Sequence, residues 1–200
     1  MKRFVLCLLA MSFLLGGCKV FSGSYYSATP HQNQSQQGEA EVISVYRYAE
    51  LQDVPAINAM FRDLCFHIKE SSKDPYWDFE DFPSELGQQM IANYIQDKEK
   101  AAIVAEDNGQ LVGMILLEVI GCHLPLSSHQ RIGYIAAGYV KKDYRSQGVM
   151  RALEKMSTEF FRSLSIKYVE VNYLPANSGA KEAWNALGYE NFREQARKAI

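Results

Sequence analysis

A strand-like segment that leads through a short turn into an amphipathic helix places the strongest constraint on this chain. Residues 133–140 are mostly apolar, and residues 149–164 carry apolar side chains on one stripe of a helix. The turn between them, residues 145–150, reads RSQGVM. Backbone N–H groups at such a junction point outward together and meet the positive end of the helix dipole. We therefore predict that the turn binds a pyrophosphate, which implies a cofactor that carries a nucleotide.

A second motif follows downstream, where residues 177–189 have the spacing Asn-x-x-Ala-x-x-x-Trp-x-x-x-Gly-Tyr. Together the two motifs resemble those of the GNAT family of N-acetyltransferases. That family reads Arg/Gln-x-x-Gly-x-Gly/Ala in the turn and Asn-x-x-Ala-x-x-x-Tyr-x-x-x-Gly-Phe after it. The opening segment, residues 43–57, is also similar to the family's first strand and helix. The resemblance covers residues 42–200.

Hydrophobic periodicity predicts one domain in which strands and helices alternate. The expected strands cover residues 42–48, 101–106, 111–120, 132–141 and 167–173, and the expected helices residues 54–68, 84–98, 149–164 and 178–187. The Asn108-Gly109 pair predicts a tight hairpin. The resemblance implies an α/β (α+β) GNAT fold, a mixed, mostly antiparallel central sheet flanked by helices in the order β-α-α-β-β-β-α-β-α-β. Only residues 189–200 remain to form the last strand.

The amino-terminal segment has the pattern of an export signal. Two basic residues precede an apolar run over residues 4–15, which is too short to cross a bilayer, since a spanning helix needs about 20 residues. The sequence LGGC at residues 15–18 resembles a bacterial lipoprotein box, in which Cys18 receives lipid. The alternatives are a plain secretory peptide or a short membrane-docking helix.

These features divide the chain into a cleaved signal peptide at residues 1–17, a flexible polar tether at residues 18–41 and a GNAT-like domain at residues 42–200. The tether is rich in Ser, Gln and Asn and has few aliphatic residues, a composition that cannot bury enough surface to order itself. We expect a membrane-anchored lipoprotein of the bacterial cell envelope. Acetyl-CoA is a cytosolic metabolite, so a cytoplasmic protein with a mis-assigned start is the alternative.

The charge of the chain argues against a nucleic-acid partner. Removing Lys2 and Arg3 from the 21 basic residues leaves 19 against 23 acidic ones, a net charge of −4. We expect a small partner and no metal, because the cysteines and histidines lack metal-ligand spacing. Cys65 and Cys122 are expected to be buried thiols, with an export-dependent disulfide as the alternative.

The resemblance implies a site for acetyl-CoA as cosubstrate. Gly138, Tyr139 and Val140 would line the pantetheine arm, and Asn177 would contact it. The pyrophosphate would lie against the turn formed by Arg145, Ser146, Gln147, Gly148, Val149 and Met150. Basic side chains near the turn could screen the phosphates or form a solvated basic face; they are Lys141, Lys142, Arg145 and Arg151. Asn177 taken alone also has the pattern of a helix cap.

Two residues depart from the family pattern. Met150 stands where the family has Gly or Ala, so its side chain takes room near the cofactor. Trp184 stands where many members have a tyrosine thought to protonate the departing thiolate, and an indole N–H cannot act as an acid near pH 7. A thiol with a pKa of about 8.5 leaves tolerably without help. The general base is unassigned, with Glu118, Glu170 and Tyr173 as weak candidates for catalytic roles.

The segment between the first two expected helices, residues 74–82, mixes four acidic with four aromatic residues. Carboxylates and ring faces together suit an ammonium group, and aromatics that pin a loop are the alternative. The resulting hypothesis is an N-acetyltransferase that acts on a primary amine of a small molecule or peptide, preferably one with a low pKa. The competing hypothesis is an envelope-tethered, catalytically weak binding module of the same fold.

Overall fold

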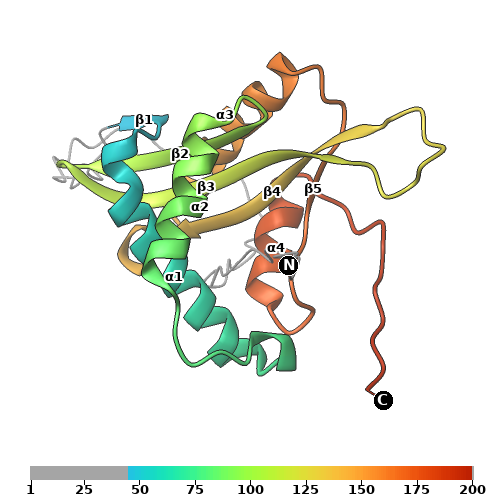
Figure 1. The fold of residues 1–200 in the computed structure, drawn as a ribbon, viewed down its shortest axis with the longest axis horizontal. Coiled ribbons are helices and arrows are strands. Elements are labelled where there is room, and N and C mark those ends of the chain that lie inside the picture. The colour runs from blue at the N-terminus through green and yellow to red at the C-terminus, as the bar shows by residue number, and fades with distance from the viewer. Residues whose placement is uncertain (1–44, 200) are drawn as a thin grey trace, which may run out of the picture.

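Five strands form one sheet in the order β1-β2-β3-β4-β5 in the computed structural model, which describes residues 45–199 (Figure 1). The predicted signal peptide and the whole predicted tether, including Cys18, lie outside the described residues. The strands are β1 Val45–Tyr48, β2 Lys100–Asp107, β3 Gln110–Gly121, β4 Arg131–Val140 and β5 Val169–Val171. The first four pair antiparallel, and β5 pairs parallel to β4. This sheet confirms the expected fold class.

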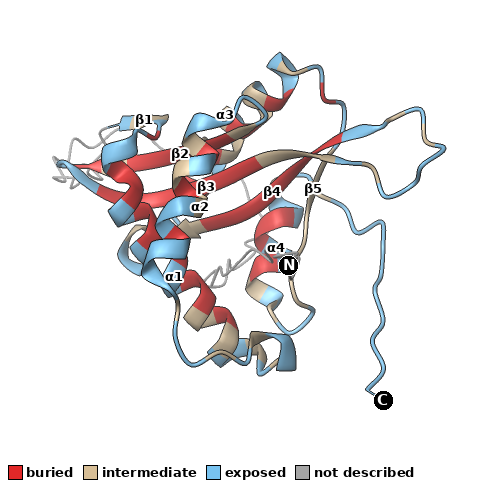
Figure 2. Cartoon of the chain, viewed as in Figure 1, coloured by how far each residue is buried: buried red, intermediate tan, exposed pale blue. Residues whose placement is uncertain are grey.

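Helices cover both faces of the sheet. The helices are α1 Val54–Ser72, α2 Ser84–Gln96, α3 Val149–Ser163 and α4 Ser178–Ala186, with short 3-10 turns η1 Leu51–Asp53, η2 Pro75–Trp77 and η3 Lys142–Tyr144. Side chains of α1 and α2 pack with one face of the sheet, and those of α3 and α4 pack with the other. Figure 2 shows that the buried surface follows the strands and the inner faces of the helices. No described helix is long and apolar enough to span a membrane.

The predicted hairpin joins β2 to β3. Asn108 and Gly109 have φ angles of 47° and 77°, the positive values that a tight two-residue turn needs.

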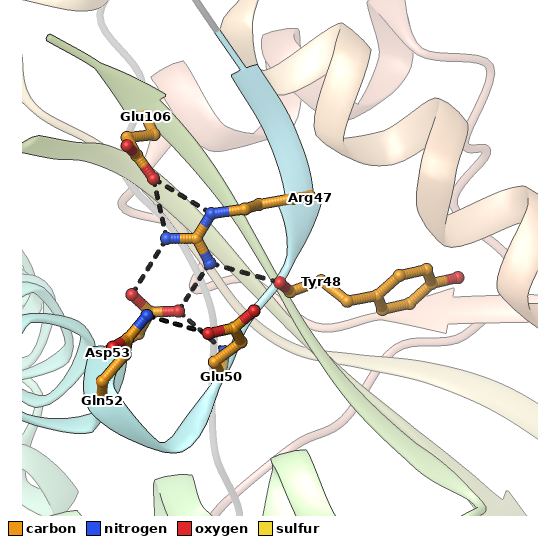
Figure 3. Close-up of polar contacts among 6 residues, drawn as sticks. All are labelled: Arg47, Tyr48, Glu50, Gln52, Asp53 and Glu106. Atoms are coloured by element: carbon orange, nitrogen blue, oxygen red, sulfur yellow. Dashed lines mark hydrogen bonds and ion pairs between the residues drawn. The ribbon is translucent and has the colours of Figure 1, made fainter. Parts of the chain in front are cut away.

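A charged cluster ties β1, η1 and β2 together (Figure 3). The Arg47 guanidinium donates to Asp53 at 2.7 and 3.0 Å and to Glu106 at 2.7 and 3.0 Å. The hydrogen bond from Arg47 holds the pKa of the buried Asp53 carboxyl below its usual value, and the Glu50 N–H, which also donates to Asp53, lowers it further. The start of α1 is therefore fixed to the first hairpin by charge-assisted hydrogen bonds.

The last strand, expected within residues 189–200, is not formed in the described chain. Residues 190–199 are exposed and have no regular secondary structure. Their side chains are mostly charged or polar and lack the apolar alternation that would bury a strand. Ion pairs hold this tail instead: Arg193 pairs with Glu170 at 3.5 Å and Arg197 with Asp74 at 2.8 Å.

Both described cysteines are free thiols. Cys65 is buried, as predicted, and burial raises its pKa to about 12, so it stays protonated at neutral pH. Cys122 is only half-buried. Within residues 45–199 there is no disulfide and no cluster of metal-ligating side chains.

Candidate acyl-donor site

The two parallel strands separate halfway along β4. Pairing between β4 and β5 is limited to residues 133–135, whereas β4 continues to Val140. A register shift in the β3–β4 ladder, where Leu116 faces Ala137 but Leu117 faces Ile135, places a bulge at Ala136. Within the described chain, the β4 edge beyond Ile135 has no strand partner on the β5 side.

The direction in which the backbone N–H and C=O groups point along this edge follows from the alternation of an antiparallel strand pair. The Lys141 N–H donates to the Val112 carbonyl at 2.8 Å, so the groups of Val140 and Gly138 point away from β3. The Val140 carbonyl indeed accepts from Arg145 Nε at 3.0 Å. The edge at Gly138 and Val140 can therefore donate and accept hydrogen bonds with an extended, amide-bearing ligand such as pantetheine.

The turn after β4 presents backbone N–H groups at the start of α3. Ser146 and Gly148 have φ angles of 63° and 81°, a left-handed geometry that turns successive amides toward one side. Gly148 caps α3 without a side-chain hydrogen bond, and the first intrahelical bond runs from Ala152 N to Gly148 O at 3.1 Å. The amides from Gly148 to Arg151 therefore lack partners within the helix, as an anion site requires.

Side chains fix the turn and surround it with positive charge. Gln147 Nε2 donates to the Asp143 carbonyl at 2.8 Å, and the Arg145 guanidinium lies 5.9 Å from the centre of the Tyr139 ring. The basic residues near the turn form no ion pair with any other residue in the described range; they are Lys141, Lys142, Arg145 and Arg151. Burial and then the Arg145 charge lower the pKa of His67 on α1.

Met150 and Trp184 lie together against Gly138. A Cβ placed on Gly138 would be 3.2 Å from Met150 Cε and 3.9 Å from Trp184 Cζ2. Met150 is 6% exposed and Trp184 0%. The Met150 thioether therefore does not cover the outward amides of the turn. It fills the space beside the β4 edge, where the resemblance places pantetheine.

Comparison with known protein families shows to which family this chain belongs. Residues 63–189, more than half of the chain, match the sequence profile described as the acetyltransferase (GNAT) family. The chain belongs to the acetyltransferase (GNAT) family. No curated protein sequence matches it.

Solved structures share the GNAT fold at low identity. One is the tetramutant of a Bacillus halodurans protein. It has a TM-score of 0.67 and 16% sequence identity, and the match covers 78% of this chain and 100% of that chain. A predicted acetyltransferase with acetyl-CoA from Clostridium acetobutylicum has a TM-score of 0.60 and 15% identity over 78% and 95%. An aminoglycoside antibiotic 6'-N-acetyltransferase from Acinetobacter baumannii has a TM-score of 0.60 and 12% identity over 78% and 98%.

In this GNAT domain, the two carboxylate candidates for catalysis lie on either side of Tyr134. Register pairs join Glu118 to Tyr134 and Tyr134 to Glu170, so the three side chains share the α1/α2 face. Glu118 pairs with Lys100 at 3.2 Å. The Tyr134 hydroxyl accepts from Asn172 Nδ2 at 3.2 Å, which bridges β4 to the end of β5.

Sequence reasoning missed Tyr134, because only the strand register brings it between the two glutamates. Tyr173 lies apart from this row: it packs with the α3/α4 face, and its hydroxyl hydrogen-bonds Asn191. Asn177 caps α4 by accepting from Ala180 N at 3.0 Å, so its contact with a cofactor stays a prediction.

The loop over residues 74–82 divides into two parts. Trp77, Phe79 and Phe82 pack against the core and pin the loop. Tyr76 is 76% exposed, and Arg197 lies 4.3 Å from its ring centre while donating to both Asp74 oxygens at 2.9 and 2.8 Å. The exposed part of the loop, at Asp74 and Tyr76, is therefore occupied by the guanidinium of Arg197.

Proposed function

We propose that the protein transfers an acetyl group from acetyl-CoA to a primary amine of a small molecule or peptide. The observation that carries this proposal is the turn at residues 145–148, which presents uncapped amides of α3 next to the free edge of β4. A diphosphate fits the first feature and a chain of amides the second. Gly138 has no side chain of its own on this edge, although Met150 now packs against it.

The chain's residues have separate tasks in this reaction. The amides at the start of α3 hold the pyrophosphate, and the β4 edge aligns pantetheine so that the thioester lies where β4 and β5 separate. The acceptor nitrogen attacks the thioester carbon; a C–N bond forms, the C–S bond breaks and the electron pair leaves with sulfur. The amine must also lose a proton.

Two carboxylates beside Tyr134, those of Glu118 and Glu170, are the candidates to accept the proton that the amine loses. Glu118 is ion-paired with Lys100 at 3.2 Å, and Glu170 is ion-paired with Arg193 at 3.5 Å. An amine with a pKa of about 8 loses its proton more readily than a lysine near 10.4. We therefore expect higher kcat/KM for low-pKa amines, and pH profiles of several amines that showed equal preference for lysine would contradict this.

Binding of acetyl-CoA tests the proposal directly. We expect acetyl-CoA to raise the melting temperature of the purified protein and to give a product whose mass has increased by one acetyl group. The filled space at Met150 favours the second candidate, a tethered binding module without transfer activity. A protein that neither binds acetyl-CoA nor acetylates any amine in a mixed panel would support that module.

The compartment is a separate part of the proposal. We infer from the amino-terminal pattern that residues 1–17 are cleaved and that Cys18 carries lipid on the envelope. Mass spectrometry of the native amino terminus tests this. A mature chain that begins with a lipid-modified Cys18 supports it, and an intact Met1 contradicts it.

A further inference from the structure

The carboxy-terminal tail, residues 190–199, has no secondary structure and is held through its side chains. All of its residues are exposed (Figure 2). Asn191 hydrogen-bonds the Tyr173 hydroxyl, and Arg193 and Arg197 each form an ion pair with the body of the domain. An ion pair between exposed side chains shifts an equilibrium by no more than about fivefold. The tail can therefore leave its place while the domain stays folded.

Arg197 occupies a site that suits a positively charged group. Its guanidinium donates to both Asp74 oxygens at 2.9 and 2.8 Å and lies 4.3 Å from the centre of the Tyr76 ring. The carboxylate is held in place, because Asp74 Oδ1 also accepts from the Tyr76 N–H at 2.9 Å. Paired charge-assisted hydrogen bonds and a ring face together bind cations. We call this site the Asp74–Tyr76 corner.

Arg193 occupies a second carboxylate, next to the place proposed for the thioester. Its guanidinium lies 3.5 Å from Glu170, whose side chain is only 12% exposed. Glu170 is in register with Tyr134, and the pairing of β4 with β5 ends one residue further on, at Ile135. The Cα atoms of residues four positions apart lie at most about 14 Å from each other. The tail thus reaches from the separation of β4 and β5 to the Asp74–Tyr76 corner.

The two arginines occupy these carboxylates without being able to react. A guanidinium keeps its proton in proteins, so its nitrogens do not become nucleophiles. A primary amine in the place of the Arg193 guanidinium can lose its proton and attack a thioester. The tail is therefore an unreactive peptide that lies where a reactive peptide would fit.

We propose that the acceptor is a basic peptide segment that displaces this tail. A positive side chain of that peptide replaces Arg197 at the Asp74–Tyr76 corner, and an amine four residues earlier lies beside Glu170 and receives the acetyl group. This inference rests on the proposed function and narrows it to peptide acceptors. The covalent step is unchanged: the amine nitrogen forms the C–N bond, its proton passes to Glu170 or to water, and coenzyme A leaves with the sulfur electron pair.

Two peptides test the acceptor. Both have the sequence of residues 190–197 with Arg193→Lys and blocked ends, so that one lysine is the only amine, and the second also carries Arg197→Gln. The shared lysine removes amine pKa from the comparison. With the Arg197→Gln protein, whose own tail leaves the corner free, we expect kcat/KM to be about two- to fivefold higher for the first peptide. Adding Asp74→Asn should abolish this preference, because asparagine keeps the hydrogen bond to Tyr76 but has no charge.

The tail offers a matched pair of protein variants. Arg197→Gln should raise kcat/KM for the first peptide by up to about fivefold over the natural chain, because the competing cation is gone. Lys198→Gln removes the same charge from the next residue, which forms no ion pair within residues 45–199, and should leave kcat/KM unchanged. Equal kcat/KM for the two variants, or a peptide preference that survives Asp74→Asn, would overturn the inference.

An NMR titration without acetyl-CoA separates this inference from the proposed function. In the natural chain, the first peptide should shift the signals of the Arg197 Nε–H and the Tyr76 backbone amide, and the second peptide should shift them less. If these signals move but no amine is acetylated, the proposed function is wrong and the acceptor role falls with it. If other amines are acetylated and the first peptide leaves both signals in place, only the inference is wrong.

Discussion

Replacement of Gly148 by alanine probes the amide turn with the smallest possible change. Gly148 has a φ of 81°, and a Cβ added there would meet no atom within 4 Å. The cost is therefore backbone strain alone, about 1–2 kcal/mol for an L-residue in the left-handed region. For a domain of this size each 1 kcal/mol lowers the melting temperature by roughly 2–4 °C.

The same substitution should weaken acetyl-CoA binding. Relief of the strain rotates the peptide groups on either side of residue 148, so at least one amide no longer points at the phosphate. A hydrogen bond to a charged group is worth about 1.5–3 kcal/mol, which corresponds to a Kd increase of roughly tenfold to 150-fold. Isothermal titration calorimetry of Gly148→Ala against the natural chain measures this change.

The chain offers a matched control at Gly109. This residue has a φ of 77° and equally open surroundings, but it lies in the β2–β3 hairpin. Gly109→Ala should lose similar stability and keep the natural Kd. Two variants with equal stability and equal affinity for acetyl-CoA would refute the assignment of the turn as the phosphate site.

Three further predictions concern other sites. Met150→Ala should cost about 2–5 kcal/mol of unfolding free energy, as buried large-to-small changes do, yet tighten acetyl-CoA binding; weaker binding would show that the thioether does not stand in the ligand's way. The pKa of Asp53 is lowered by Arg47, so the unfolding free energy should fall as the pH drops below about 4, and Asp53→Asn should flatten that dependence in acid titrations followed by circular dichroism; an equally steep curve would count against it. Arg197→Ala should leave the melting temperature unchanged and raise kcat/KM for cationic amines by freeing Asp74, whereas an unchanged kcat/KM would remove Asp74 from the acceptor path.

Local patterns predicted those parts of the fold that local chemistry determines. The Asn108-Gly109 pair predicted the hairpin correctly. The helix predicted from the apolar stripe of residues 149–164 agrees closely with α3, Val149–Ser163. The start of α3 directly after Gly148 could be predicted in the same way. These features depend on neighbouring residues only, so periodicity and turn chemistry are sufficient.

Features that depend on distant pairing could not be predicted from the sequence. The bulge at Ala136 is one such feature, because its place is set by which β3 residues face β4. The position of Tyr134 between Glu118 and Glu170 comes from the same register. The last strand failed to form because the tail finds carboxylate partners in place of a ladder.

Both outer strands of the sheet are short, with four residues in β1 and three in β5. A strand from a second molecule could gain only one or two hydrogen-bonded pairs along either of these described strands. Extension of the sheet into a second molecule through these two strands would therefore gain little free energy. Pairing between copies through β1 or β5 should therefore contribute little to aggregation when many molecules are crowded together.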